Sequence, residues 1–411
     1  MIVDRMNPLS QTELDVAVLG RKESLFSHEV EARRKDLLDV VDGARVLVVG
    51  GGGTIGSATT ALLADLRPGC LHVIDQSENY LAELVRDLRG RPGGLGVKDF
   101  RTLPLDYGAP VTGRFLAESR PYDIVLNFAA LKHVRSEKDV YSLLQMIDTN
   151  VVRHIRFRRW LKAAGHGARY FAVSTDKAAN PTSLMGASKR LMEDVVFAPD
   201  LSLAGQESTA RFANVAFSNG SLLQGFIQRL AKGQPLAAPR DTRRYFVSQR
   251  ESGEICLLSA VLGKPGHVLF PKLDPISQLQ PLQDIAERIL QLAGYEPEVV
   301  ENEDEARAAV ARLASAGKWP LLLTPLDTSG EKAYEEFVGQ GEVLTQSGLM
   351  SLDAVAHVRS TALSQSVIEM LEEAVSHNDR TINKHAIVQA IQAAIPGFSH
   401  RETGKTLDDR L

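Results

Sequence analysis

An acidic and a basic side chain stand next to each other in the segment STDKAANPTSLMGASKR, which begins at Ser174. Thr175 precedes the adjacent pair Asp176 and Lys177, and Lys189 follows twelve residues after Lys177. A carboxylic acid and a neutral amine can give and take protons at neighbouring atoms of one substrate, provided that burial favours their uncharged forms. At a solvated turn the same residues would do no chemistry, so the hypothesis depends on where the fold places them.

A second group of residues is suited to binding a pyrophosphate. Gly50, Gly53 and Gly56 form G-x-x-G-x-x-G directly after an apolar run, and Thr54 and Ile55 lie between the last two glycines. Glycine lets the backbone approach the phosphates closely, and the N-terminus of the following helix adds unpaired N–H groups and a positive dipole end. The pattern therefore predicts a dinucleotide site.

The nature of the dinucleotide is indicated by Asp75, which closes the next strand 19 residues after Gly56. This is near the spacing expected of a carboxylate that binds the ribose. A carboxylate accepts a hydrogen bond from a free 2′-hydroxyl and repels a 2′-phosphate, and the segment DQSEN supplies no arginine or lysine. The sequence therefore favours NAD over NADP. We expect further cofactor contacts from Ser77, Asp106, Tyr107, Ala129, Ala130, Lys132, Asn150 and Lys189.

The elements that must position these residues alternate between short apolar strands and helices. We expect strands at 46–49, 71–75, 100–105, 123–128, 169–174, 209–215, 267–271 and around 319–324. We expect helices at 57–66 and near 301–315, and two amphipathic helices between 362 and 394. Such alternation predicts an α/β fold, a Rossmann-type doubly wound parallel sheet with a smaller C-terminal substrate-binding lobe and helical extensions at both ends.

The same pattern suggests four regions along the chain. They are an N-terminal helical extension (1–42), an NAD-binding Rossmann domain with interleaved substrate-binding segments (43–265), substrate-lobe elements (266–345) and a C-terminal helical tail (346–411).

Composition narrows the class of protein. The chain has 411 residues with 44% hydrophobic and 24% charged residues, as in globular proteins, and its net charge of −4 provides no strong field for nucleic acid or an anionic membrane. Two cysteines and scattered histidines argue against a disulfide framework and lead us to expect no metal site. Because no apolar run approaches the ~20 residues of a membrane helix and no signal-peptide core is present, we expect a cytoplasmic protein without membrane insertion.

Several longer segments carry a resemblance to a known family. They are GGGGTIGS, NFAALKHVRSEKD with DTNV downstream, STDKAANPTSLMGASKR, RFANVAFSNGS and RRYFVS, spread over about residues 20–340. Together they resemble the extended short-chain dehydrogenases/reductases, and more narrowly the nucleotide-sugar 4,6-dehydratases of bacterial surface-polysaccharide and nonulosonic-acid pathways. Those enzymes act on UDP-N-acetylglucosamine or close relatives.

The resemblance implies roles for the residues introduced above. After oxidation at C4 of the sugar, Lys177 would remove the C5 proton and Asp176 would protonate the departing O6. Lys189 would orient the nicotinamide ribose, and Thr175 is our candidate for relaying the proton of the 4-hydroxyl. NADH would then return its hydride to C6.

One departure from the family concerns its usual Y-x-x-x-K, which is present here as Met185 followed by Lys189. Methionine can neither donate nor accept the proton that tyrosine handles, so a simple dehydrogenase or 4-epimerase would lose its acid/base. One branch of the 4,6-dehydratases has methionine at this position, and the chain resembles that branch. We therefore expect Met185 to fill apolar space.

The expected activity is an NAD-dependent 4,6-dehydratase (a hydro-lyase) for UDP-N-acetylglucosamine. The alternatives are the GDP-linked substrate, a dehydratase that inverts C5, a nucleotide-sugar 4-epimerase, and an NAD-binding scaffold or sensor without turnover. By resemblance, the substrate contacts are Lys132, His133, Met185, Asn214, Ser221 and Arg244. The family also implies a homo-oligomer. The basic run from Arg153 to Lys162 is expected to form a solvated or subunit-facing surface rather than a nucleic-acid site.

Overall fold

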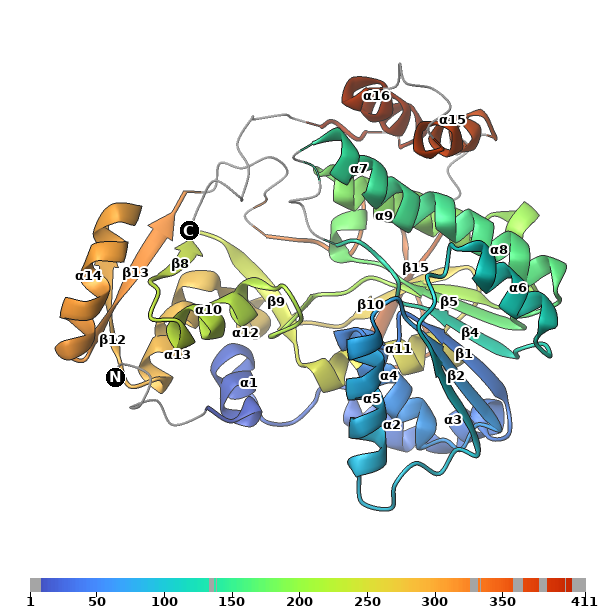
Figure 1. Ribbon diagram of the computed structural model, residues 1–411, viewed down its shortest axis with the longest axis horizontal. Coiled ribbons are helices and arrows are strands. Elements are labelled where there is room, and N and C mark those ends of the chain that lie inside the picture. The colour runs from blue at the N-terminus through green and yellow to red at the C-terminus, as the bar shows by residue number, and fades with distance from the viewer. Residues whose placement is uncertain are drawn as a thin grey trace.

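The computed structural model describes residues 9–132, 137, 139–325, 332, 334–357, 365–376, 383–395 and 397–400. A large sheet with helices on both faces forms one side of the molecule, and a smaller lobe lies beside it (Figure 1). Within these residues no helix combines the length and apolar character needed to cross a bilayer.

The large sheet has the strand order β14-β15-β10-β6-β5-β4-β1-β2-β3. Its strands are β1 (Arg45–Val49), β2 (Cys70–Ile74), β3 (Asp99–Leu103), β4 (Ile124–Asn127), β5 (Arg169–Val173), β6 (Glu207–Ala210), β10 (His267–Pro271), β14 (Leu344–Thr345) and β15 (Leu352–Ala356). The seven strands from β10 to β3 in this order run parallel to one another. Strand β15 runs antiparallel to β10, and β14 runs antiparallel to β15. The order reverses at β1 and β4, which is where open parallel sheets bind ligands.

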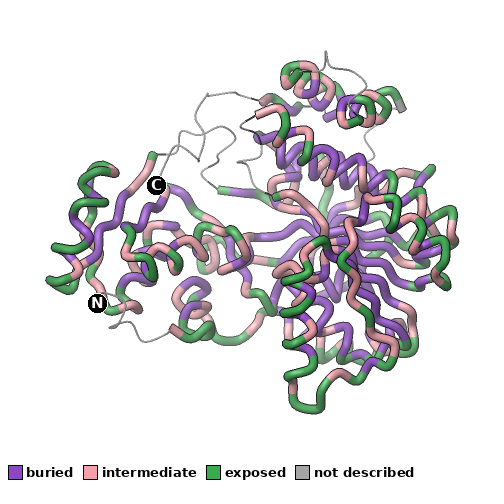
Figure 2. The backbone as a smooth tube through the Cα atoms, viewed as in Figure 1, coloured by how far each residue is buried: buried purple, intermediate pink, exposed green. Residues whose placement is uncertain are grey.

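Alternating residues of the central strands pack against helices on opposite faces. Val46 and Val48 join one apolar cluster with α4, α5 and α11, while Leu47 and Val49 join another with α6, α8 and α9. The bounds of these helices are α4 (Thr54–Ala64), α5 (Glu78–Gly90), α6 (Pro110–Glu118), α8 (Arg153–Ala163), α9 (Leu184–Val196) and α11 (Gln249–Leu262). Figure 2 shows the resulting continuous buried centre, so the sheet is a rigid base for residues at its strand ends.

The smaller lobe is built from two three-stranded sheets. One is parallel, with β8 (Leu236–Pro239), β12 (Glu296–Val300) and β13 (Lys318–Thr324), and the other joins β7 (Asn214–Val215), β9 (Arg243–Val247) and β11 (Leu279–Pro281). Helices α10 (Leu222–Ala231), α12 (Pro275–Gln278), α13 (Leu282–Leu292) and α14 (Glu303–Ser315) complete the lobe. Its core is centred on Trp319, which is fully buried and donates its indole N–H to the Gln234 carbonyl at 3.0 Å.

Helices extend the fold at both ends. α1 (Gln11–Leu19) packs on α13, and α2 (Ser27–Ala32) and α3 (Arg34–Val41) pack on α11. At the other end α15 (Gln365–Val375) lies against α7 (Val140–Ile147) and the π-helix η3 (Asp148–Val152), and α16 (Lys384–Ala394) lies against α9. The predicted α/β fold class is therefore confirmed, including helices at both ends.

Most predicted strands agree with the structure to within two residues, and the differences have local causes. The strand expected at 209–215 is interrupted after Ala210, and residues 214–215 pair with β9 in the smaller lobe. Between them, Arg211 turns into the core to form buried ion pairs. The helix expected from Ser57 begins at Thr54, because Gly53 already serves as its N-cap.

The regional division is finer than the sequence pattern suggested. The range 266–345 is shared between the two sheets, since β10 and β14 belong to the large one. The range 346–411 supplies the sheet strand β15 before its two helices.

The basic run on α8 was expected to be a solvated or subunit-facing surface, and for Arg158 this is wrong. Its side chain is fully buried, donates to the Leu201 carbonyl at 2.7 Å and pairs with Glu207 at 3.2 Å. Its guanidinium carbon lies 4.2 Å from the ring centroid of Tyr170. Burial is tolerated because these partners satisfy part of the positive charge.

Candidate active site

The three glycines after β1 differ in what requires them. Gly50 has φ +69°, and a Cβ there would lie 2.7 Å from the main-chain nitrogen of Ala129 at the end of β4. A Cβ at Gly56 would lie 2.3 Å from the Gly50 carbonyl oxygen, so both positions exclude other side chains through the fold itself. At Gly53 the nearest atom would be 3.5 Å away. Space is therefore open at Gly53, at the N-terminus of α4, where a pyrophosphate would approach.

Two carboxylate contacts place Asp75 beside this turn. Its Oδ2 accepts a hydrogen bond from the Gly52 N–H at 3.0 Å, and its Oδ1 accepts one from the Ser77 N–H at 2.9 Å. Ser77 in turn caps α5, since its hydroxyl accepts the Tyr80 N–H at 3.3 Å. The end of β2 therefore carries a fixed carboxylate next to the glycines, as a ribose site requires.

Two other expected cofactor residues have their side chains engaged in the fold. Asp106 pairs with Arg153 and accepts the Gly108 N–H at 2.9 Å. Tyr107 is buried, its ring meets Phe157 edge-on at 5.6 Å, and its hydroxyl donates to the Thr149 carbonyl. Both side chains are therefore held by contacts within the protein just after β3.

The turn after β4 is held by Asn150. Its side chain exchanges two hydrogen bonds of 2.9 Å with the main chain of Leu131 and donates a third, also of 2.9 Å, to the Ser188 hydroxyl on α9. The amide is thereby fully occupied, so Asn150 positions the turn that includes Ala129 and Ala130. Of these two, Ala129 directly adjoins Gly50.

The acid and the amine lie together at the carboxyl end of β5. Asp176 begins the single-turn helix η4 (Asp176–Ala178), and its side chain is 3% exposed. Its Oδ1 accepts the Thr175 hydroxyl at 2.8 Å and the Lys177 N–H at 2.9 Å, and it lies 3.3 Å from Lys177 Nζ. The Lys177 side chain is 24% exposed. The pair is thus largely withdrawn from solvent rather than displayed on a surface turn.

Lys189 lies on α9, the helix that packs against η4. Its ammonium group donates to the Val173 carbonyl at 2.6 Å, and burial lowers the pKa of Lys189 to about 8. Met185, one turn earlier, is 2% exposed and belongs to an apolar cluster with residues of α7 and η3. The methionine occupies core space, as expected.

The residues expected to contact the substrate include Lys132, which follows β4, and three residues of the smaller lobe, Asn214, Ser221 and Arg244. Lys132 donates to the Ser218 hydroxyl at 3.4 Å, and burial lowers the pKa of Lys132. The Asn214 amide donates to the Tyr245 carbonyl at 3.3 Å, and the Ser221 hydroxyl caps α10. Arg244, on β9, donates to the Lys332 carbonyl at 2.9 Å. His133 lies outside the described residues.

A segment that sequence analysis did not associate with the site lies over η4. We call residues 334–342 the strap. Asn180 accepts the Gln340 N–H at 2.8 Å and donates to Glu336 at 3.1 Å, and a Cβ at Gly339 would lie 2.3 Å from the Ala179 carbonyl oxygen. This close approach fixes the strap against the loop that follows the acid–amine pair.

Buried charges anchor the end of the strap. Arg211 donates to Glu342 at 2.7 Å and to Glu193 at 2.8 Å, and Arg190 also pairs with Glu342. Although burial acts to raise it, hydrogen bonding and positive charge from Arg211 lower the pKa of Glu342 to about 2. The ionised carboxylate therefore stabilises the folded chain.

This gives a pH-dependent prediction for Glu342→Gln. Glu342 titrates near 2 in the folded chain and at 4.5 when unperturbed, so its contribution is present above pH 4.5 and is lost as the pH falls toward 2. We expect the variant to lose about 3 kcal/mol of unfolding free energy at pH 7 and much less at pH 3. Urea unfolding at both pH values measures this, with the exposed Glu336→Gln as control. An equal loss at both would contradict the assignment.

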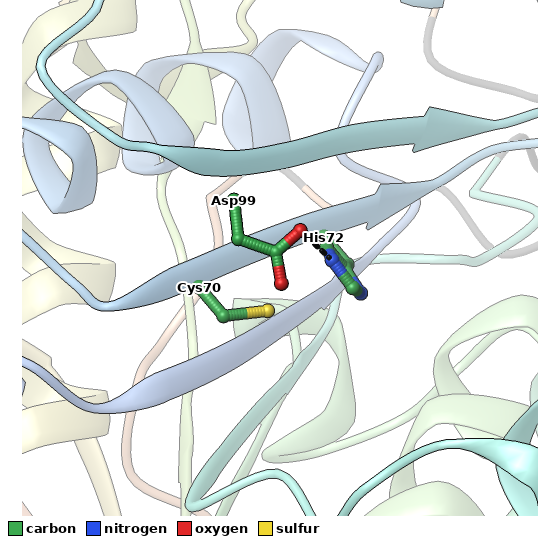
Figure 3. A group of neighbouring side chains, drawn as sticks. All are labelled: Cys70, His72 and Asp99. Carbon is green, nitrogen blue, oxygen red and sulfur yellow. Dashed lines mark hydrogen bonds and ion pairs between the residues drawn. The ribbon is translucent and has the colours of Figure 1, made fainter.

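One group at the opposite edge of the sheet has metal-ligand residue types. Cys70 and His72 on β2 and Asp99 on β3 place ligand atoms within 4.8 Å of one another (Figure 3). His72 already pairs with Asp99 at 3.1 Å and with the Tyr122 hydroxyl at 2.6 Å, and Arg101 lies 3.1 Å from Asp99. Burial raises the pKa of Cys70 to about 11, which favours the neutral thiol. We interpret the group as a structural hydrogen-bond network.

Comparison with known proteins identifies the family. A sequence model described as polysaccharide biosynthesis protein matches residues 46–356. The chain belongs to this family. The matched residues include the large sheet, the smaller lobe and the strap.

Individual relatives are more distant. An uncharacterized membrane protein of Methanocaldococcus jannaschii is 28% identical over 316 residues, covering 75% of this chain and 84% of the relative. A probable polysaccharide biosynthesis protein of Bacillus subtilis is 26% identical, covering 79% of this chain and 49% of the relative, so the chain spans about half its length. A UDP-N-acetylglucosamine 4,6-dehydratase (inverting) of Campylobacter jejuni is 27% identical, covering 56% and 68%. A UDP-glucose 4-epimerase of Rickettsia akari is 25% identical, covering 64% and 72%.

Solved structures share the fold. Pen from Bacillus thuringiensis has a TM-score of 0.62 at 20% identity, covering 77% of this chain and 88% of its own. The Bordetella bronchiseptica enzyme WbmF, in complex with NAD+ and UDP, has a TM-score of 0.52 at 18% identity, covering 67% and 89%. The chain is thus related to nucleotide-sugar dehydratases and epimerases, and the expected family resemblance is confirmed. Its assignment to the branch with methionine in place of tyrosine stays a prediction.

Proposed function

We propose that the chain is an NAD-dependent 4,6-dehydratase that converts a nucleotide-linked N-acetylhexosamine, first of all UDP-N-acetylglucosamine, to its 4-keto-6-deoxy derivative. The observation that carries this proposal is the Asp176 carboxylate, buried at the sheet edge 3.3 Å from Lys177 Nζ and 2.8 Å from the Thr175 hydroxyl. The likeness to the Campylobacter jejuni dehydratase supports the substrate.

The cofactor site fits a dinucleotide. Open space at Gly53, the uncapped N-terminus of α4 and the Asp75 carboxylate would hold the pyrophosphate and the ribose. When bound, NAD would supply the hydride acceptor at C4 and the hydride donor at C6. Lys189, whose ammonium group lies at the Val173 carbonyl at the end of β5, would orient the nicotinamide ribose. WbmF binds NAD+ on the same fold, which supports this cofactor.

The protein's own groups account for the proton movements. The 4-hydroxyl proton passes to Thr175, whose hydroxyl already donates to Asp176 Oδ1, so Asp176 becomes a neutral acid. The neutral Lys177 amine then takes the C5 proton, which the neighbouring ketone has made acidic. Asp176 gives its proton to O6, the C6–O6 bond breaks, and water leaves. The transfer to O6 restores the Asp176 carboxylate. Lys177 finally returns its proton to C5, which restores the neutral amine.

An epimerase is the second candidate, because a Rickettsia UDP-glucose 4-epimerase is also related. Epimerisation at C4 needs an acid/base beside O4 and no group at O6. Here Met185 occupies core space where that tyrosine would stand, and Asp176 and Lys177 would be without a purpose. The GDP-linked substrate, inversion at C5 and a scaffold role remain alternatives for experiment.

The test is incubation of the purified protein with UDP- and GDP-N-acetylglucosamine, followed by mass spectrometry. We expect a product lighter by one water from the UDP sugar. A product of unchanged mass would indicate an epimerase, and no product from either sugar would support a scaffold. Incubation in heavy water and the configuration at C5 of the product distinguish retention from inversion.

A further inference from the structure

The strap brings a second carboxylate to the proposed base. Glu335 is 5% exposed, and its Oε1 lies 3.8 Å from Lys177 Nζ. The same Oε1 lies 4.0 Å from Arg244, and Oε2 lies 3.9 Å from Lys332 Nζ. Oε2 is buried and accepts no hydrogen bond from any described residue. The sequence motifs of the site contain no hint of Glu335, which lies 158 residues after Lys177.

These contacts place Glu335 between two parts of the site. On one side is the amine that must lose a proton before it can act at C5. On the other is Arg244, whose fork-shaped guanidinium suits a diphosphate and which the family resemblance assigns to that group. Lys332 completes the surroundings and donates to the Asn180 carbonyl. The strap holds the carboxylate there through the anchored Glu342.

The charges make Glu335 sensitive to both neighbours. Burial raises the pKa of Glu335, the positive charges of Lys177, Arg244 and Lys332 lower it, and the negative charge of Asp176 raises it. An anion that arrives at Arg244 adds negative charge next to Glu335, and like charge favours the protonated form of a carboxylate. Occupation of Arg244 thus makes Glu335 a better proton acceptor.

We propose that Glu335 is a positioning residue that couples the diphosphate site to the base: with a diphosphate at Arg244, it accepts the proton of Lys177. This inference rests on the proposed function and adds regulation of the same site. An N–H bond of the Lys177 ammonium breaks and an O–H bond forms on Glu335, leaving a neutral amine and a neutral acid. After turnover Glu335 returns the proton to Lys177. Lys177 is thereby converted to the neutral amine only when the diphosphate of a substrate is bound at Arg244.

The test measures Lys177 without requiring turnover. Trace acetylation by acetic anhydride over a pH series, read by mass spectrometry of the Lys177 peptide, gives the pH midpoint at which this amine becomes reactive. Loss of the Glu335 charge removes the stabilisation of the ammonium form. We therefore expect Glu335→Gln to move the midpoint down by about one pH unit, making Lys177 roughly tenfold more reactive below it. Glu336→Gln, the exposed neighbour, should leave the midpoint unchanged, and Glu335→Asp should return it toward the native value.

UDP is the probe for the coupling, because it carries the diphosphate without the sugar. UDP should lower the Lys177 midpoint in the native protein and have no further effect in Glu335→Gln. Equal midpoints in native protein and Glu335→Gln, or an undiminished UDP effect in that variant, would overturn the proposal. Should Glu335→Gln fold poorly, the absence of a UDP effect in the native protein alone would overturn it.

The outcomes separate this inference from the proposed function. A shifted midpoint without a product from any nucleotide sugar would leave the coupling intact and refute the dehydratase. A dehydrated product together with an unshifted midpoint would refute the role of Glu335 alone.

Discussion

Lys177→Ala is expected to lower the rate of dehydration by about 10³–10⁴-fold while NAD remains bound. The amine is the one basic group within 4 Å of Asp176 among the described residues, and general acid–base groups contribute up to about this factor. Cofactor affinity should persist because the glycine turn and Asp75 follow β1 and β2, which lie two and three strands away from β5. Product formation by mass spectrometry and NAD titration measure the two effects separately.

Two further variants separate proton transfer from charge pairing. Lys177→Arg keeps a positive charge beside Asp176 but holds its proton at all working pH values, so it should be nearly as slow as the alanine variant. Lys232→Ala removes an exposed lysine at the end of α10 and should retain full activity. Near-native turnover in Lys177→Arg would refute the assignment of this residue as the base.

Gly53→Ala is expected to weaken NAD binding on the order of 100-fold without destabilising the fold, because a Cβ there enters the path of the pyrophosphate. In the protein itself that Cβ would meet only the Gly50 carbonyl oxygen at 3.5 Å, an ordinary contact. The backbone at Gly53 has φ −69°, which alanine adopts readily. Thermal unfolding of the free protein and calorimetric titration with NAD measure the two properties.

Gly56→Ala is the matched control, one helical turn away. Its Cβ would lie 2.3 Å from the Gly50 carbonyl oxygen, and crowding of this kind costs about 1–3 kcal/mol of unfolding free energy. This variant should therefore unfold at lower temperature before any cofactor is added. Equal stability losses in both variants, or unchanged NAD affinity in Gly53→Ala, would argue against the proposed cofactor position.

Local signals explain why much of the fold was predictable. The parallel strands β1, β2, β4 and β5 of the large sheet are short, mostly apolar runs, and the glycine spacing marks the first turn because Gly50 and Gly56 have no room for a Cβ. Asp75 was identifiable because it directly follows the buried strand β2, and Asp176 because it comes shortly after the buried strand β5. Position relative to strand ends therefore carried the prediction of the site.

Long-range pairing explains what the sequence could not predict. Strand β6 ends just before Arg211, whose side chain pairs with Glu342 in the core. Glu342 lies 131 residues further along the chain, so no local sequence pattern indicates this pairing. Glu335 could not be predicted for a similar reason, because it lies far along the chain from Lys177 and its segment has neither strand nor helix periodicity. The engaged side chains of Tyr107 and Asn150 were equally invisible, because a motif names residues and says nothing of which atoms are already bonded.

The most direct test of the central claim follows one hydrogen through the reaction. UDP-N-acetylglucosamine labelled with deuterium at C4 is incubated with the NAD-loaded protein, and the product is examined by mass spectrometry and NMR. We expect a 4-keto product that has lost one water and carries the label on C6, because the hydride removed from C4 returns to the carbon that lost its hydroxyl. Recovery of the label at C4 in a sugar of unchanged mass would contradict the proposed dehydration.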